Sequence, residues 1–169
     1  MPQSYTRIIV HTTFSTKYRK PWILPRWEQG LYQFLDARLR AAGCRVYGIG
    51  GVLDHVHLLH SLPTTRSIAK VLEAIKTESS HWMKKQGCSV FYWQNGYASF
   101  SVDYRNMEGI QRYVERQKLH HYGSMEGYAE VVKLSFEQEF RRLLDAYGVE
   151  YEERWLFETD PAEAAGNLE

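Results

Sequence analysis

Two histidines spaced two residues apart are the first feature of this sequence that can do chemistry. They form His55-Val56-His57, inside the aliphatic run of residues 52–59. Side chains alternate along a strand, so both imidazoles share one face and can converge on a metal ion. Histidines on an exposed strand face have the same spacing without any metal. Burying the pair without ligand or hydrogen-bond partner would cost roughly 1–3 kcal/mol per unpaired group.

A second motif, Tyr113-Val114-Glu115-Arg116-Gln117, lies on a predicted helix over residues 106–121. Tyr113 and Gln117 are about 40° apart on one helix face, one turn from each other, and can act on one centre. A half-buried boundary tyrosine without a function is the alternative. A phenolate beside a metal ion can attack phosphorus and form a covalent phosphotyrosine, which conserves bond energy for rejoining.

Hydrophobic periodicity and turn residues predict the elements that must position these groups. A strand over 4–14 is followed by a helix from Pro25 to a cap at Gly43. Further strands are predicted over 45–52, 53–62, 90–93 and 97–102. A type I′ turn at Asn95-Gly96 is predicted to join the last two. Further helices are predicted over 65–85 and 106–121. The order predicts an α+β fold, an antiparallel sheet with helices packed on it.

Length and composition predict one soluble domain. The chain has 169 residues, 44% hydrophobic and 24% charged, which excludes a disordered or fibrous protein. Two cysteines exclude a disulfide framework, and no apolar run approaches the roughly 20 residues of a membrane span. These features favour a cytoplasmic protein with no membrane partner.

Charge is distributed unevenly along the chain. Residues 1–134 carry 18 basic and 10 acidic side chains, whereas residues 135–169 carry 3 and 10. A basic body favours a polyanionic partner such as nucleic acid, although a moderately cationic surface needs no such partner. After it, Ser135 to Gln138 form a predicted capping box for a helix closed at Gly148, and residues 158–169 form an acidic tail predicted to be frayed.

Taken together, residues 4–134 resemble the single-tyrosine HUH transposases of small bacterial insertion sequences, including relatives associated with repetitive extragenic palindromes. The resemblance rests on residues 54–59 and 113–117, supported by residues 75–80 and 91–97. It implies a ferredoxin-like domain, usually a homodimer, that binds single-stranded DNA hairpins and cleaves near them with Mg²⁺ or Mn²⁺. By motif position, His55, His57 and Gln117 would be metal ligands, and Tyr113 the nucleophile that forms a 5′-phosphotyrosine.

We therefore expect a catalytic domain over residues 1–134 and a C-terminal helical extension with an acidic tail over 135–169. Candidate DNA contacts are cations that are poor core residues: Lys17, Arg19, Lys20, Lys76, Lys84, Lys85, Arg112 and Arg116. Trp22, Trp93 and Tyr97 are candidates for stacking on unpaired bases. Three other functions fit the same residues. They are a nickase of the replication-initiator or relaxase type, a domesticated protein that binds hairpins without cutting, and a metal-storage or structural protein that uses His55 and His57 and has no affinity for DNA.

Overall fold

A four-stranded antiparallel sheet forms the centre of the protein in a computed structural model that describes residues 3–125 and 133–165. Its spatial order is β2-β3-β1-β4, the order of a ferredoxin-like sheet. The strands are β1 (Ile9–Ser15), β2 (Val46–Gly51), β3 (His55–Ser61) and β4 (Ala98–Ser101). The predicted α+β sandwich is therefore confirmed, and β3, which carries both motif histidines, lies in the sheet interior.

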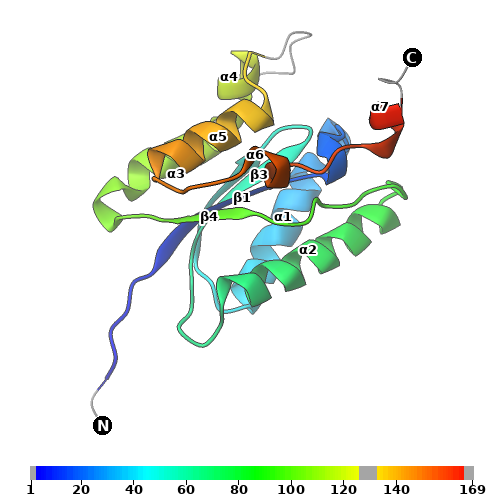
Figure 1. Cartoon of the computed structure of the whole chain (residues 1–169). Helices are drawn as coiled ribbons and strands as arrows, with labels where there is room; N and C mark the ends of the chain where they lie inside the picture. The colour runs from blue at the N-terminus through cyan, green and yellow to red at the C-terminus, as the bar shows by residue number, and fades with distance from the viewer. Residues whose placement is uncertain (1–2, 126–132, 166–169) are drawn as a thin grey trace.

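Two helices cover one face of the sheet (Figure 1). They are α1 (Pro25–Ala41) and α2 (Ile68–Lys85). Pro25 occupies the first turn of α1, where its missing N–H is not needed, and the Ser67 side chain caps α2 by accepting a hydrogen bond from the Lys70 N–H. Their apolar stripes pack against Val56 and Leu58 of β3 to form the main core. This core supports β3 on the face that carries Val56 and Leu58.

The other face of the sheet is covered by helices from the second half of the chain (Figure 1). These helices are α3 (Met107–Glu115), α4 (Gln117–Tyr122) and α5 (Phe136–Ala146). The single helix predicted over 106–121 is wrong, since Arg116 leaves helical geometry with φ −105° and ψ 27°. The break separates Tyr113, in the last turn of α3, from Gln117, at the start of α4.

The predicted hairpin around Asn95-Gly96 is also wrong. Residues 90–93 form no strand, and Trp93 makes only an isolated bridge with Thr16. Gly96 does adopt the positive φ of 82° that a tight turn requires. The Lys76 ammonium donates hydrogen bonds to the carbonyls of Gln94 and Gly96 at 2.6 and 2.8 Å, so a side chain from α2 stabilises this loop in place of a strand ladder.

The C-terminal extension folds back onto the sheet. The predicted capping box at Ser135 and Gln138 is present, and Gly148 follows α5 with a φ of 62°. Two short helices follow, α6 (Glu153–Leu156) and α7 (Pro161–Ala165), so part of the tail predicted to be frayed is helical, and its last residues, 166–169, lie outside the described part. Within residues 3–125 and 133–165, no helix has the length and apolarity needed to cross a membrane.

Candidate metal and nucleophile site

The two motif histidines lie on the same face of β3, as their spacing predicts. Both are fully buried, and their ring centroids are 5.1 Å apart. They face α3, α4 and α5, whereas Val56 between them faces the opposite core. His60 lies on that opposite side, where its Nε2 is 3.2 Å from the Thr12 hydroxyl. The exposed-face alternative for the motif is thereby excluded.

A carboxylate from the C-terminal extension meets this pair. Glu139 of α5 is only 2% exposed, and its Oε2 is 3.2 Å from Nε2 of His55 and 3.2 Å from Nε2 of His57. His121 of α4 approaches the same oxygen with its Nε2 at 3.0 Å. Neither Glu139 nor His121 was predicted as a site residue. The predicted motifs contain neither of them, and only the tertiary fold brings them to the β3 histidines.

Tyr113 and Gln117 reach the same cluster despite the helix break. The Tyr113 hydroxyl donates a short hydrogen bond to the other oxygen of Glu139, Oε1. The Gln117 side chain donates through Nε2 to the Tyr113 carbonyl at 3.2 Å, and its Oε1 lies 3.4 Å from Nε2 of His55. All four residues predicted for catalysis and metal binding therefore lie together.

The donor set at the centre of the cluster fits a divalent metal. Ligand atoms of His55, His121 and Glu139 lie within 4.8 Å of one another, and all three residues are buried. Two imidazoles and a carboxylate are ligands that transition metals and Mn²⁺ accept, and an additional amide oxygen from Gln117 would favour a harder cation. The predicted set of His55, His57 and Gln117 shares only His55 with this trio.

Charge in the cluster is balanced around Glu139. Burial would raise the pKa of the Glu139 carboxyl, but His57, His121 and His55 hold the pKa well below its usual value. Burial would lower the pKa of His55, but Asp54 and Glu139 raise it to about 10. Burial and the Glu139 carboxylate raise the pKa of the Tyr113 phenol above its usual value. The two carboxylates therefore favour a protonated His55, which pairs with Glu139.

Each motif histidine has a further partner behind it. Nδ1 of His55 donates to Oδ1 of Asp54 at 2.6 Å. Nδ1 of His57 is 2.8 Å from Nε2 of His11, a buried residue of β1 whose ring is stacked on that of His57. Burial, together with neighbouring His57, lowers the pKa of His11 to about 3, so this imidazole is neutral. His11 is not among the predicted site residues.

The candidate DNA contacts fall into three groups. Arg112, Arg116 and Lys85 are exposed, the first two beside Tyr113. The Lys76 ammonium is bound to backbone carbonyls of the 94–96 loop, and burial lowers its pKa to about 8.

The third group is engaged with other side chains. Arg19 pairs with Glu137 at 2.7 Å, and Lys20 pairs with Asp160 at 2.8 Å. Lys17 and Lys84 lie over the rings of Tyr18 and Tyr92. Among the stacking candidates, Trp93 is 7% exposed and part of the main core, so its ring is not available to a base.

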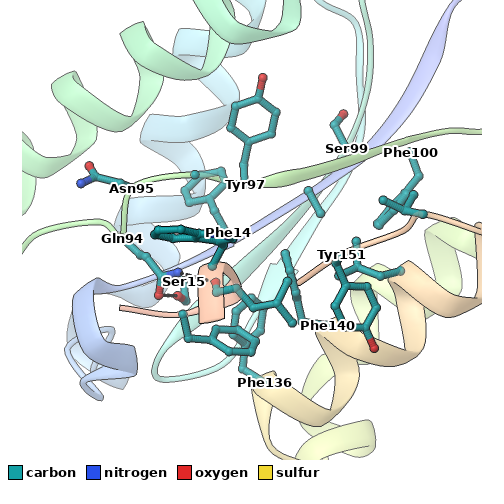
Figure 2. A pocket seen from close by; sticks show the side chains of 17 residues that line it. Phe14, Ser15, Gln94, Asn95, Tyr97, Ser99, Phe100, Phe136, Phe140 and Tyr151 are labelled. Atoms are coloured by element: carbon teal, nitrogen blue, oxygen red, sulfur yellow. Dashed lines mark hydrogen bonds between the residues drawn. The ribbon is translucent and has the colours of Figure 1, made fainter. Parts of the chain in front are cut away.

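A cavity of about 410 Å³ lies between β4 and the C-terminal extension. Figure 2 shows aromatic side chains from both sides facing it, among them Phe14, Phe136 and Phe140. The histidine cluster does not line this cavity, because the Phe136 ring lies between the cavity and the cluster. The Phe136 ring centroid is 4.6 Å from that of His55. The cavity is therefore formed jointly by the sheet, the 94–97 loop and the extension, and it is separate from the histidine cluster.

The fold is a ferredoxin-like sheet that carries a buried His-x-His pair. A tyrosine on a neighbouring helix packs against this pair. This combination of fold and site defines a class of protein. Residues 4–117 match the family model described as "Transposase IS200 like". The chain therefore belongs to the IS200-like transposase family, and the predicted family is confirmed. No curated protein matches the chain significantly.

Two solved structures share the fold. One is a protein from Deinococcus radiodurans R1, provisionally assigned as a transposase: it is 22% identical over 69% of this chain and 96% of its own, with a TM-score of 0.56. The other is a REP-associated tyrosine transposase bound to a REP hairpin: it is 16% identical over 95% of this chain and 92% of its own, with a TM-score of 0.54.

Proposed function

We propose that this transposase cleaves and rejoins single-stranded DNA next to hairpins through a covalent 5′-phosphotyrosine on Tyr113. The observation that carries the proposal is the convergence on Glu139: one carboxylate oxygen contacts three imidazoles and the other accepts the Tyr113 hydroxyl. A tyrosine held beside a cluster of metal-ligand residues suits phosphoryl transfer to a phenol, because a bound cation would offset the charge of the phosphate while the phenol oxygen attacks.

We further propose that His55, His121 and Glu139 hold a divalent cation, Mg²⁺ or Mn²⁺, with His57 and Gln117 as the remaining ligands from the cluster. Their donor atoms and burial support this assignment. A bound cation would withdraw charge from the scissile phosphate.

The residues around Tyr113 have separate tasks in this reaction. The phenol loses its proton as its oxygen attacks phosphorus, the bond from phosphorus to the 3′-oxygen breaks, and the 3′-oxygen takes up one proton, so the leaving strand ends in a 3′-hydroxyl. Glu139 Oε1 accepts the hydrogen bond of the phenol and so orients its oxygen. The Gln117 side chain contacts both the Tyr113 carbonyl and the His55 ring. It therefore fixes the position of the nucleophile relative to the proposed metal site.

Exposed Arg112 and Arg116 flank Tyr113 and are our proposed phosphate contacts. A hairpin partner is supported by the fold shared with the REP-bound transposase. The homodimer, and the division into residues 1–134 and 135–169, remain predictions.

A denaturing-gel assay for a covalent protein–DNA adduct tests the function directly. Single-stranded hairpins from DNA flanking the gene are incubated with Mn²⁺ or with EDTA. We expect an adduct only with Mn²⁺, and none from Tyr113→Phe, because this change removes only the nucleophilic oxygen while hairpin binding persists. Tyr104→Phe is the matched control, since Tyr104 is an exposed tyrosine outside the cluster. An unchanged adduct yield in Tyr113→Phe would refute the assignment.

A second candidate, a protein that binds hairpins without cutting them, is favoured by the closed site. His55 and His57 are completely buried beneath the helices of the second half of the chain, so a DNA strand reaches them only if α5 moves. Hairpin binding without an adduct, across several flanking sequences and with a double-stranded control, would support this second candidate.

A further inference from the structure

The His57 imidazole has two nitrogens with different surroundings. Its Nε2 faces the Glu139 carboxylate at 3.2 Å, on the side of the proposed metal site. Its Nδ1 faces Nε2 of His11 at 2.8 Å, on the side of β1. A metal ligand must offer a lone pair at the nitrogen that binds, so the other nitrogen carries the proton and needs an acceptor.

His11 is built into the sheet so as to supply that acceptor. On β1 it pairs with Leu59, and Thr13 pairs with His57, which makes His11 and His57 diagonal neighbours on the same face. The rings are 5.1 Å apart at 23°, and His11 is 1% exposed. The His11 and Tyr113 rings also form a T-shaped contact, with their centroids 5.9 Å apart. His11 therefore lies beneath both the proposed ligand and the proposed nucleophile.

Stability alone does not explain a histidine at this position. Within the described residues, Nδ1 of His11 is buried and has no hydrogen-bond partner. A buried polar atom without a partner destabilises the fold, and an aliphatic residue would fill the position without that penalty. The single hydrogen bond of the ring, to His57, is thus the interaction for which a histidine is needed.

We propose that His11 is a positioning residue for His57: Nε2 of His11 accepts the Nδ1 proton of His57 and so directs Nε2 of His57 toward the metal. This inference rests on the proposed function, because it assumes that the cluster binds a divalent cation. Asp54 accepts the Nδ1 proton of His55 in the same manner. The two motif histidines therefore differ in the partner at Nδ1, which is a carboxylate for His55 and a neutral imidazole for His57.

Mn²⁺ titration of the full chain, followed by the electron paramagnetic resonance signal of free Mn²⁺, tests the proposal. We expect His11→Leu to weaken binding about 10- to 100-fold, the usual effect of losing the partner behind a ligand. His11→Gln should recover most of the affinity, because its amide oxygen can accept the same proton.

His60→Leu is the matched control. His60 is also a fully buried sheet histidine that contacts a β1 side chain, Thr12, but on the opposite face. Its replacement should leave Mn²⁺ affinity unchanged. An equal loss in His60→Leu, or no loss in His11→Leu, overturns the role of His11 while the metal site stands. A wild-type chain that binds no Mn²⁺ instead refutes the proposed metal site.

Imidazole ¹⁵N chemical shifts give a second readout that does not depend on the stability of a variant. In wild-type protein with Mg²⁺, His57 should carry its proton on Nδ1. A proton on Nε2 of His57 in the Mg²⁺-bound protein would overturn the proposal, even if His11→Leu failed to fold.

Discussion

Negative charge stands on both sides of the His55 imidazole: Asp54 at Nδ1 and Glu139 at Nε2. These two carboxylates outweigh burial and raise the pKa of His55 to about 10 in the metal-free protein. His55 is then protonated at neutral pH, and the proton occupies the nitrogen that a metal needs. Binding of the proposed metal would therefore displace a proton from His55.

Mn²⁺ affinity should consequently increase with pH. Below the raised pKa of His55, each bound ion releases one proton, so the dissociation constant should fall by up to about tenfold per pH unit. Titrations at about pH 6.5 and about pH 8.5 measure this dependence. Asp54→Asn removes the larger attraction on the His55 proton and should flatten it. A dissociation constant independent of pH in the wild type would contradict the protonated state of His55.

At the scale of elements, the approach of α3 to β2 determines where Tyr113 lies. A β-carbon on Gly50 would overlap the carbonyl oxygen of Val114, the residue after Tyr113. Only glycine lets the backbones of strand and helix come this close. Gly50 therefore helps to determine where Tyr113 lies.

Gly50→Ala should destabilise the fold by about 1–3 kcal/mol, the usual effect of overpacking, and should displace Tyr113. Chemical denaturation and the adduct assay measure the two effects. Gly109→Ala, within α3, is the control: no atom lies within 4 Å of its added β-carbon, and alanine should stabilise the helix by about 0.5–1 kcal/mol. Equal stabilities of the two variants would contradict the close-approach argument.

Local patterns predicted the elements that carry the site but not the contacts that complete it. Strand alternation placed His55 and His57 on one face, and the capping box at Ser135 located the start of α5. Glu139 looks like an ordinary helical acid in sequence, and its role depends on α5 docking over β3, a long-range contact. Likewise, Asn95-Gly96 predicted a hairpin, but the loop is instead stabilised by hydrogen bonds from the Lys76 ammonium of α2, a long-range contact that the local sequence does not reveal.

At the scale of the whole molecule, the acidic tail folds back onto the basic body. Lys20, a predicted DNA contact, pairs with Asp160 at 2.8 Å and Glu163 at 3.1 Å. If Lys20 contacts DNA as predicted, the tail acids and DNA phosphates would compete for the same cation. Both pairs are at the surface, although Asp160 is partly covered, and surface ion pairs contribute little to stability, so they can be exchanged at low cost.

Combining Asp160→Asn with Glu163→Gln should strengthen hairpin binding and make it more sensitive to salt. Freeing Lys20 allows one more phosphate contact, which should steepen the slope of log affinity against log salt by about 1. Fluorescence anisotropy over a salt series measures both quantities. The control is Glu152→Gln, because Glu152 pairs with Arg154 rather than with the basic loop. If both variants gave the same slope, Lys20 would not be a DNA contact.

The position of Glu139 on α5 has a consequence for how the extension is held. His55 belongs to the sheet, His121 to α4 and Glu139 to the extension, so one ion bound among them would clasp three separate parts of the chain. Docking of α5 and retention of the ion would then be reciprocally coupled, each favouring the other by the same factor. A DNA strand that levers α5 away would loosen the ion, and depletion of the ion would release the extension.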